Sequence, residues 1–586
     1  MTLVFSGVEP GPVTHAAKRK IQSHLRRCPA GHVWSVETPG SAEHHAAMHG
    51  EAGFDFVAID PRTHEPEEPS EAARPSAAKV VLDLFEANRA RLVRDQYGEP
   101  YARFRDRRVL PLTKGGAGAV LTGLYLEQMG GAVPPKNAVG DALELLRARA
   151  LSDAPTEPVY LRFGPLPPDE LGRPTGVAID LGDEDCRAIV IRPGCWAIEP
   201  HPINFRRTAA MEALPEPTRV AGMSPDALVI GIRALLNLAD DQMARLVVAF
   251  LVSLLKPEGP FLGIAMTGPA GAAKTFGARL IRRLIDPTNR DGGGGVRSLP
   301  RDPDAFAAIV TGNAIPVFDN LSGATPDQAD MLAQVMTGYS NEKRRLYTDD
   351  ETFQRSAKRP VILTGIDITD RSDLLSRLLV IELEPFESYR TEASLWREFD
   401  EAHPVILALV CDAVAGAYKV LPTVREDSWR VRMADSIRFV TAAEPALGWP
   451  SGWTEQALAD SQDDTVGAVL STQSWFPPLV AVLDAHGDSY TGSMLSLLDA
   501  MTTRYIRASM ESAGREFEEA ADRPRTSDST WPKDATRLAS VLKRNVSGLR
   551  KVGITYTTVK TNGRRSITVV RLPEAQDVGA NRRQRP

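Results

Sequence analysis

The feature that most constrains this chain is a strand, a glycine-rich loop and a helix in direct succession, "FLGIAMTGPAGAAKTFGARLIRRLI", residues 261–285. The apolar run up to Met266 predicts a buried strand, and the apolar spacing after Thr275 predicts an amphipathic helix. A loop in this position holds phosphate groups, because its backbone N–H groups and the start of the helix point at the anion. The segment therefore predicts an α/β nucleotide-binding core.

The loop "GPAGAAKT" supplies the residue types that bind a nucleoside triphosphate. Lys274 would reach the β and γ phosphate oxygens, and the Thr275 hydroxyl would bind magnesium. Ala273 stands where a glycine usually precedes the lysine; its small side chain suffices, provided that its backbone avoids positive φ. A Gly/Ala-rich turn without a ligand is the alternative. The expected cofactors are ATP and Mg²⁺, and the expected contacts are Gly268, Pro269, Ala270, Gly271, Ala272, Ala273, Lys274 and Thr275.

A second acidic site is predicted in "NAIPVFDNLSG", where an apolar strand ends in Asp319 and Asn320. Asp319 fits the magnesium side of the site. Asn320 stands where a catalytic glutamate is expected, and an asparagine cannot accept a proton. Either Asp319 acts as the base, or Asp302 or Asp349 comes near, or turnover is slow. An Asx turn that ends a strand is the alternative interpretation.

Composition bounds the rest of the chain. At 586 residues it is too long for one core. The net charge of −6 gives no global nucleic-acid signature, so any basic surface must be local. Four cysteines, no signal-peptide pattern and no long apolar run predict a cytoplasmic protein without a membrane span. Cys28, His32, His44 and His45 lack the spacing of a zinc site.

The domain organisation follows from shifts in pattern along the chain. Residues 1–75 are poorly defined and end in a Pro/Glu-rich linker. We expect an α+β accessory domain over 76–215, a helical collar and P-loop core over 216–400, and a helical domain over 401–515. A polar linker then separates a module at 525–575 from a disordered basic tail at 576–586.

Further motifs follow the second strand of the core. "EKRRLYTDDETFQRSAKR" predicts a hairpin with basic residues at its start. "RPVILTG" is a buried strand with Thr364 near its tip, in the position of a γ-phosphate sensor, and Arg377 precedes the strand "LLVIEL". A solvated charged loop and a surface arginine are the alternatives for the hairpin and for Arg377.

This ordered set resembles superfamily 3 helicases, an AAA+-like group, and within them the phage, plasmid and poxvirus primase-helicases. The resemblance covers residues 215–400 and implies a ring, usually a hexamer, with nucleotide between subunits and DNA in the channel. It implies metal binding by Asp319 and DNA contacts by Lys343, Arg344 and Arg345. Arg377 would be the arginine finger that reaches a neighbour, with Arg371 as a second candidate. Thr364 departs from the usual sensor asparagine, and Asn320 departs from the second acid. A primase, if needed, would be a separate protein.

The C-terminal segment "WPKDATRLASVLKRNVSGLRKVGITYTTVKTNGRRSITVVRL" predicts an amphipathic helix followed by a hairpin with an Asn-Gly turn. This order resembles the latter half of a winged helix. The helix would then lie on DNA, and the hairpin would contact backbone phosphates. A protein-interaction domain is the alternative. The predicted DNA contacts here are Lys543, Arg544, Lys560, Arg564 and Arg565.

The sequence thus favours an ATP-hydrolysing DNA helicase or translocase that serves replication of a phage or mobile element. A nucleotide-gated DNA-binding regulator or defence protein without processive unwinding is the alternative, because Asn320 and Thr364 depart from the pattern. An ATP-dependent protein-assembly factor is a third.

Overall fold

A computed structural model describes residues 76–289, 293–344, 352–369, 371–385, 390–512, 531–561 and 564–572. Two compact units are distinguished, Met1–Val80 and Val81–Pro586, and nearly all described residues belong to the second. The predictions for residues 1–75, for the polar linker before 531 and for the tail 576–586 lie outside the described residues.

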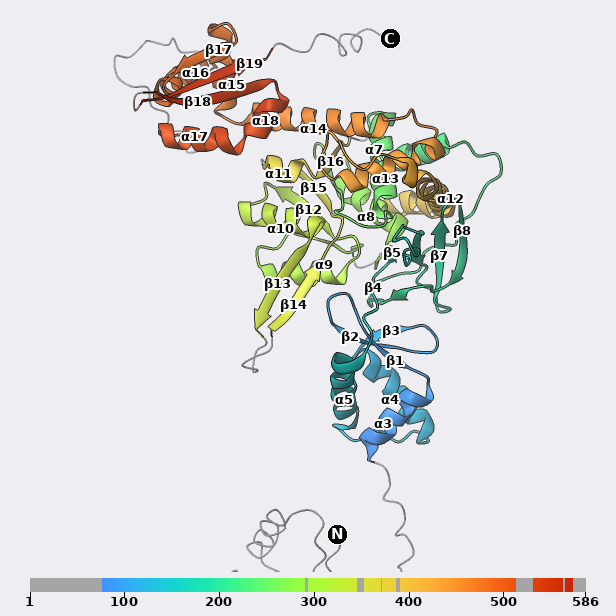
Figure 1. The fold of residues 1–586 in the computed structure, drawn as a ribbon. Helices are drawn as coiled ribbons and strands as arrows, with labels where there is room; N and C mark the ends of the chain where they lie inside the picture. Colours follow the sequence, from blue (N-terminus) through green and yellow to red (C-terminus); the bar gives the residue numbers. More distant parts are fainter. Residues whose placement is uncertain are drawn as a thin grey trace, which may run out of the picture. The chain divides into compact units, whose positions relative to one another are not determined.

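A parallel five-stranded sheet forms the centre of the second unit (Figure 1). In its three interior strands, residues 263–266, 317–318 and 362–365 are buried, as expected for a parallel sheet with both faces covered. This confirms the mixed α/β prediction. In spatial order the strands are β11 (Val296–Arg297), β12 (Val317–Ser322), β15 (Ile362–Asp367), β10 (Gly263–Thr267) and β16 (Leu378–Glu382). The connecting helices are α8 (Lys274–Ile285), α9 (Pro303–Gly312), α10 (Pro326–Thr337) and α11 (Ser372–Leu375).

Strand order puts a crossover point beside β10. The chain leaves β10 toward β11 at one edge of the sheet, whereas it leaves the adjacent β15 toward β16 at the other. In open parallel sheets, ligands bind outside the carboxyl ends of strands at such a point. The carboxyl ends of β10, β12 and β15 therefore form the natural place for a site.

The end of β12 is irregular. Its register with β15 shifts between Phe318 and Leu321, which leaves Asn320 exposed. Gly365 of β15 lets the two backbones meet, because a Cβ there would lie 2.3 Å from the Leu321 carbonyl oxygen. A bulge of this kind redirects side chains at the end of a strand.

A hairpin extends from the core after α10 (Figure 1). Its strands β13 (Tyr339–Arg344) and β14 (Thr352–Ala357) pair in register from Tyr339 with Ala357 to Arg344 with Thr352. The predicted hairpin is therefore present. At its base, the Tyr339 hydroxyl donates to the Pro303 carbonyl at 3.2 Å.

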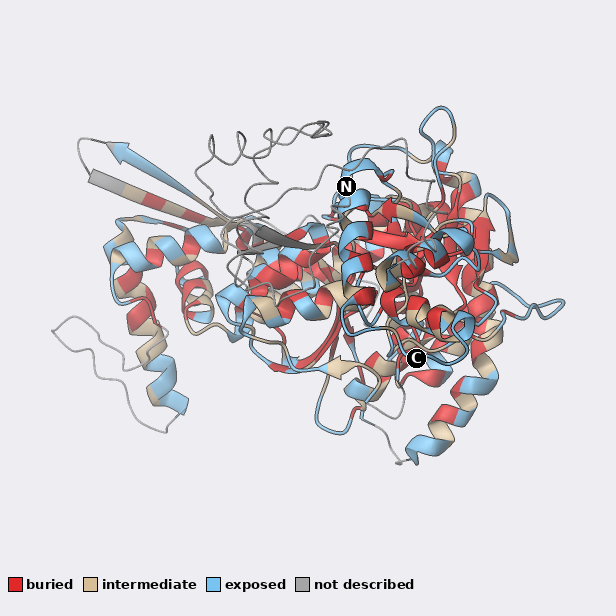
Figure 2. Ribbon diagram, turned by 90° about the horizontal axis from the view of Figure 1, so that it is seen from below, coloured by how far each residue is buried: buried red, intermediate tan, exposed pale blue. Residues whose placement is uncertain are grey.

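Helices pack around the sheet, and their buried sides form one continuous core with it (Figure 2). The predicted helical segment before the loop is in fact two helices. Among the described residues α12 alone is long and apolar enough to cross a membrane, and 61% of its apolar window is buried inside the fold. Its apolar length is thus explained by the core. The helices are α6 (Asp226–Leu235), α7 (Asp241–Leu254), α12 (Glu392–Val420), α13 (Ala434–Leu447) and α14 (Trp453–Thr472), with a 3₁₀ turn at Leu421–Thr423.

The segment before α6 does not form the single accessory domain predicted over 76–215. Residues 77–153 form helices and a small sheet of their own, whereas the second sheet places Ile179 and Ile189 in the same core as the central sheet. The first part comprises α3 (Ala77–Ala87), β1 (Arg91–Arg94), β2 (Pro100–Arg103), β3 (Val109–Pro111), α4 (Ala117–Gln128) and α5 (Ala138–Asp153). The second comprises β4 (Val159–Tyr160), β5 (Phe163–Pro165), β6 (Val177–Asp180), β7 (Arg187–Arg192), β8 (Cys195–Pro200) and β9 (Asn204–Phe205).

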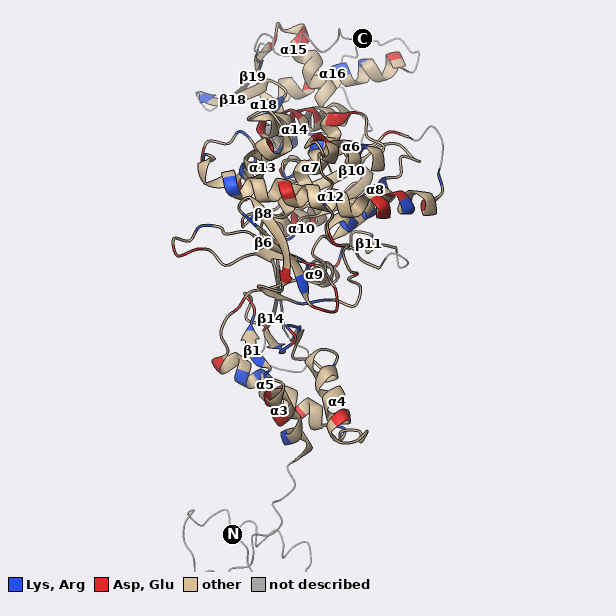
Figure 3. Ribbon diagram, turned by 90° about the vertical axis from the view of Figure 1, so that its right-hand side faces the viewer, with Lys and Arg blue, Asp and Glu red and all other residues tan. Residues whose placement is uncertain are grey.

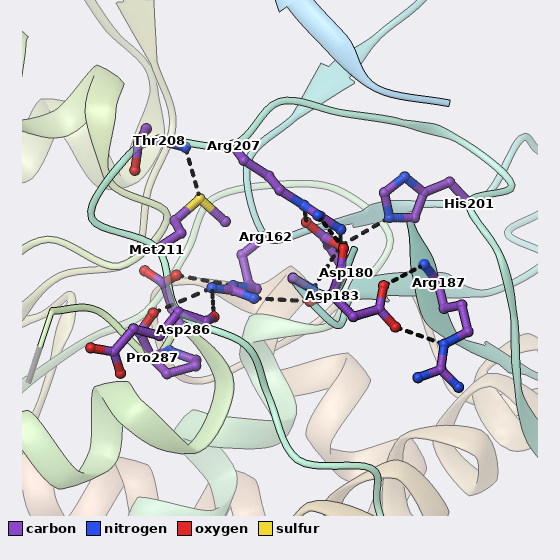
Figure 4. Close-up of polar contacts among 12 residues, drawn as sticks. Arg162, Asp180, Asp183, Arg187, His201, Arg207, Thr208, Met211, Asp286 and Pro287 are labelled. Atoms are coloured by element: carbon purple, nitrogen blue, oxygen red, sulfur yellow. Dashed lines mark hydrogen bonds and ion pairs between the residues drawn. The ribbon is translucent and has the colours of Figure 1, made fainter. Parts of the chain in front are cut away.

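A buried arginine joins this second sheet to the end of α8 (Figure 4). Arg162 is fully buried, and its guanidinium donates to Asp286 Oδ1 at 3.2 Å and to the Asp180 carbonyl at 3.0 Å. Burial works to raise the pKa of the Asp180 carboxyl, but hydrogen bonds from His201 and Arg207 outweigh it and hold that pKa well below its usual range. The network ties the accessory sheet to the helix that follows the phosphate loop.

The C-terminal module begins earlier than the predicted boundary at 525. Strand β17 pairs with β19 to complete a three-stranded antiparallel sheet, and Leu479 and Leu497 share a core with Leu538 and Leu542. The helical domain predicted over 401–515 is therefore divided, and its last part belongs to this module. The elements are α15 (Phe476–Ala485), β17 (Ser489–Gly492), α16 (Met494–Ser512), α17 (Ala535–Arg544), α18 (Val546–Lys551), β18 (Ile554–Thr561) and β19 (Arg564–Arg571).

Candidate nucleotide site and nucleic-acid surfaces

The loop between β10 and α8 carries Lys274 at the first position of the helix. The Lys274 ammonium donates to the Gly268 and Pro269 carbonyl oxygens, at 2.8 Å in each case, so its charge is held at the mouth of the loop. Gly268 has φ +136, and a Cβ there would lie 2.4 Å from the Leu383 carbonyl oxygen. This glycine is required by close packing against the residue that follows β16.

The N-terminus of α8 has no side-chain cap, in contrast to those of α7, α9, α10 and α12. Asp240, Asp302, Thr325 and Thr391 each accept a backbone N–H at the start of α7, α9, α10 and α12. The α8 N–H groups lack such a partner, and no acidic residue lies in its first turn. The first turn of α8 therefore offers free donors and the positive end of a helix dipole to an anion.

Asp319 at the end of β12 lies against this helix start. The Thr275 hydroxyl donates to Asp319, with Oγ1 lying 3.0 Å from both carboxylate oxygens. The Thr364 hydroxyl, from β15, also donates to Asp319 Oδ1 and accepts the Asn320 backbone N–H at 3.2 Å. Two hydroxyls from neighbouring elements thus fix one carboxylate at the carboxyl edge of the sheet.

The oxygen atoms of Asp319 and Thr275 suit magnesium better than a metal ion that is bound by protein side chains alone. Among the described residues no group of three or more His, Cys, Asp or Glu side chains could hold a metal ion. Magnesium needs no such cage, because it keeps several waters and binds one or two carboxylates together with substrate phosphates. Asp319 and Thr275 supply oxygen ligands of this kind on either side of the loop's mouth.

Two residues at this edge have left-handed backbones. Ala273 has φ +52, so the condition under which an alanine would suffice here without strain is not met. Alanine in this region costs about 1–2 kcal/mol. Asn320 has φ +58, a conformation that asparagine tolerates better than most residues. Asn320 therefore fits the turn at the β12 bulge, which gives this position a conformational role.

The alternative bases are placed less favourably. Asp302 is the N-cap of α9, and its carboxylate accepts the Ala305 N–H at 2.9 Å. Asp349 lies outside the described residues. Asp319 is therefore the acid whose contacts place it at the loop.

Arg377 lies at the amino-terminal ends of the parallel strands, whereas the loop lies at their carboxyl ends. It directly precedes β16, whose first residue Leu378 pairs with Gly263 at the start of β10. The five residues of β16 span about 15 Å. The Arg377 guanidinium forms an ion pair with Asp373, which also pairs with Arg432. The predicted finger therefore cannot serve the loop of its own chain from this position. Arg371, the second candidate, binds Asp330 at 2.9 Å.

The predicted DNA residues lie on two separate elements. Lys343 and Arg344 are in β13, and Arg345 lies outside the described residues. Lys543 and Arg544 are exposed at the end of α17, whose apolar face carries the buried Leu538 and Leu542. Lys560 is exposed on β18, and Arg564 and Arg565 are in β19. Basic residues are thus present on both hairpins and on one helix.

One connection was missed from the sequence. Phe306 of α9 stacks on Phe318, the residue before Asp319, with ring centroids 5.7 Å apart. It also meets Tyr339 at the base of the hairpin edge-to-face, at 5.2 Å. The aromatic residues were visible, but nothing in their spacing indicates that α9 joins these two strands.

Comparisons with known proteins bear on this arrangement. Residues 229–464 match the family described as actinomycete integrative conjugative element replication protein. Residues 479–578 match the C-terminal domain of the same kind of protein, which agrees with a module that includes α15 to β19. No curated protein matches the chain.

Solved structures give more distant likenesses. The A-form apo structure of the NrS-1 C-terminal region has a TM-score of 0.34 at 12% identity and covers 84% of this chain and 98% of that chain. A JCV helicase with a bound acetamide compound has a TM-score of 0.21 at 13% identity, covering 40% and 65%. At TM-scores this low, these likenesses carry no argument about mechanism. By its two family matches the chain is a replication protein of the mobile-element type, similar to those of actinomycete integrative conjugative elements.

Proposed function

We propose that this replication protein binds and hydrolyses ATP at the carboxyl edge of the central sheet and uses the energy to move along or unwind DNA. The observation that carries the proposal is the meeting of Lys274, Thr275 and Asp319 beside an uncapped helix start. A phosphate-binding loop and a carboxylate from a second strand are the two halves of a nucleoside triphosphatase site.

Each residue has a distinct task in this proposal. The Lys274 ammonium exchanges its two loop carbonyls for phosphate oxygens, and the first turn of α8 donates N–H groups to the same anion. Thr275 and Asp319 would hold magnesium, which neutralises charge on the β and γ phosphates. Thr364 is a positioning residue, because its hydroxyl fixes Asp319; a contact with the γ-phosphate stays a prediction.

Turnover would be slow without a second acid. Asn320 cannot accept a proton, and the Asp319 carboxylate already accepts two hydroxyls. Asp319 can still orient the attacking water, since this step depends mainly on positioning and charge stabilisation in phosphoryl transfer.

The route from this site to DNA runs through α9 in our proposal. Movement of Asp319 on ATP binding would shift Phe318, and Phe306 links that ring to Tyr339 at the base of the hairpin. Lys343 and Arg344 on β13 would then move with the nucleotide state. Coupling through packed rings requires two discrete arrangements, which DNA-dependent turnover would reveal.

Assembly into a ring, most simply a hexamer, follows from the place of Arg377. The length of β16, about 15 Å, separates Arg377 from the carboxyl end of the sheet, where the loop lies. We therefore propose that Arg377 completes the site of a neighbouring subunit. It would first have to leave Asp373. The C-terminal module, whose order helix–strand–helix–helix–helix–strand–strand resembles that of a winged helix, would add contacts through Lys543, Arg544 and Lys560.

The test is phosphate release by the full chain with and without single-stranded and forked DNA. Lys274→Ala and Arg377→Ala should each lower DNA-stimulated turnover by at least about 100-fold. Arg233→Ala is the matched control, since Arg233 is an exposed arginine paired with Asp241 away from both sites. A mixture of the two inactive variants should regain turnover if the arginine acts between subunits.

The alternative is a nucleotide-gated DNA-binding regulator, which the absence of a second acid at Asn320 favours. ATP binding without turnover under any DNA condition would contradict the motor and support this alternative. No ATP binding at all would contradict both.

A further inference from the structure

A hollow lined by arginines lies outside the nucleotide site and outside both family matches, on the small sheet of residues 77–153. It is a depression open to solvent, with a volume of about 280 Å³. Basic residues gather around β1 in Figure 3. We call it the arginine hollow, and its lining residues are Arg89, Arg91, Arg103, Phe104, Arg105 and Arg107.

The backbone brings these positive charges together although they repel. Arg91 of β1 and Arg103 of β2 are direct cross-strand partners, so their side chains leave the same face of the sheet. Like charges in this arrangement destabilise a sheet. Burial, and the positive charges of Arg91 and Arg107, lower the pKa of the Arg103 guanidinium, whereas Glu157 opposes them. The cluster therefore carries electrostatic strain that an anion would relieve.

The acids of the chain do not balance the cluster. Glu157 lies 3.3 Å from Arg91 and 3.6 Å from Arg103. Asp106, although next in sequence to Arg105, is taken by Arg108 at 2.6 Å. In the part of the chain that the structure describes, no hydrogen bond or ion pair is found for the side chains of Arg89 and Arg105. Five arginines thus line the hollow, and one carboxylate, that of Glu157, pairs with two of them.

Two of the lining arginines also have strained backbones. Arg89 has φ +50 and Arg107 has φ +69, where glycine and asparagine are the favoured residues. Strain of this kind persists where the surrounding structure holds it and is concentrated at functional sites. Arg107 is anchored by its own side chain, which donates to the His201 carbonyl at 2.8 Å. The turns at 89 and 107 therefore hold two of the lining arginines at a conformational cost.

The chemistry of the lining selects phosphate groups rather than bases. All five cations are arginines, whose planar fork matches the oxygens of a phosphate. The one aromatic residue, Phe104, is buried and packs against Phe85, with ring centroids 6.3 Å apart. It offers no face on which a base could stack. Contacts with the backbone alone carry no sequence information.

We propose that the arginine hollow is a sequence-independent binding site for the phosphate backbone of DNA. The proposal does not rest on the nucleotide site, and it assigns a binding role to the segment before residue 229, where the first family match begins. In a chain of net charge −6 the positive potential is a local feature, as expected for a nucleic-acid footprint on an otherwise acidic protein.

The test compares two double variants of the full chain. Arg89→Ala with Arg105→Ala removes the two side chains without partners. Lys136→Ala with Arg147→Ala removes the same charge from the same segment but outside the hollow, and Arg147 has only a 3.8 Å pairing with Glu99. Fluorescence anisotropy with a labelled 20-nucleotide strand, and with its duplex, gives the Kd across a range of salt concentrations.

The hollow variant should weaken single-strand binding about tenfold at low salt. It should also lower the slope of log Kd against log salt concentration by about 1.4, for two lost phosphate contacts. The same measurement with the duplex shows whether the hollow binds single-stranded or double-stranded DNA more tightly. The control should leave slope and affinity near wild type, and the same difference should persist in a Lys274→Ala background. That last result separates the proposal from the nucleotide site.

Equal weakening by the control variant, or an unchanged slope in the hollow variant, would overturn the proposal. Binding of a polyglutamate peptide that depends on Arg89 and Arg105, with DNA affinity unchanged, would also overturn it and indicate an acidic protein segment. Thermal melting checks the fold. If the alanine variant melts early, Arg89→Gly with Arg105→Gln is used, since glycine suits φ +50.

Discussion

Replacing Thr364 by valine tests whether one buried hydroxyl positions the metal-side carboxylate. Thr364 is 1% exposed, and its hydroxyl makes two hydrogen bonds, one to Asp319 and one from the Asn320 N–H. Valine has nearly the same shape, so the substitution removes these bonds without creating a cavity. Serine keeps the hydroxyl, and Thr364→Ser is therefore the matched control.

The magnitude follows from the two bonds that are lost. The neutral bond from the Asn320 N–H contributes about 1 kcal/mol, and the bond to the Asp319 carboxylate contributes about 1.5–3 kcal/mol. Their sum, about 3 kcal/mol, should lower the free energy of local opening at the end of β12 by that amount. Since 1.36 kcal/mol corresponds to a tenfold change, amide exchange there should accelerate about 150-fold.

Hydrogen exchange of peptides that contain residues 317–322 measures this local opening. A local probe is needed because a chain of several cores does not unfold in one step. Magnesium-dependent ATP binding should weaken in Thr364→Val and stay near wild type in Thr364→Ser. If exchange in the valine variant stays within about threefold of wild type, the hydroxyl does not hold Asp319, and our account of this edge is wrong.

Three further predictions follow from the same structure. Ala273→Gly should keep the free energy of unfolding within about 1 kcal/mol of wild type, because relief of the left-handed strain is offset by a more flexible unfolded chain. Ala273→Val should lose ATP binding in a nucleotide titration. Normal ATP binding by this variant would contradict φ +52 at this position. Phe306→Leu should preserve basal ATP turnover but reduce its stimulation by DNA several-fold, whereas full stimulation would exclude the α9 route. Burial lowers the pKa of His403 to about 4, so the unfolded chain binds more protons below pH 6.5. Stability should therefore fall between pH 6.5 and pH 4, by up to about 3 kcal/mol, and unfolding midpoints of His403→Gln should fall less.

The loop between β10 and α8, its flanking strand and helix, the strand that carries Asp319, and the hairpin were all predictable. Each depends on neighbours in sequence: an apolar run, a turn, a helical period. Leu538, Leu542 and Leu549 are likewise buried in one core, as their spacing indicates, although the single predicted helix is two, α17 and α18. Local patterns of this kind report secondary structure directly.

What could not be predicted depends on contacts between distant residues. The pairing of Tyr490 with Val569 places β17 in the C-terminal module, and no local signal joins those strands. The bulge at Asn320 arises where β12 meets β15 at Gly365, and nothing in the local sequence indicates it or the positive φ of Ala273. The contacts of Thr364 with Asp319 and Asn320 were not predictable for the same reason, since they depend on the bulge. A regular β12 would not have offered Thr364 the Asn320 N–H.

The central claim is that one edge of the sheet binds ATP with magnesium, and calorimetric titration of the full chain tests it most directly. We expect ATP to bind wild type in the presence of magnesium, and binding to weaken at least tenfold when magnesium is chelated or when Asp319 is replaced by asparagine. Lys274→Ala should abolish the binding, and Arg233→Ala should leave it unchanged. ATP binding that is indifferent to magnesium, Asp319 and Lys274 would contradict the account.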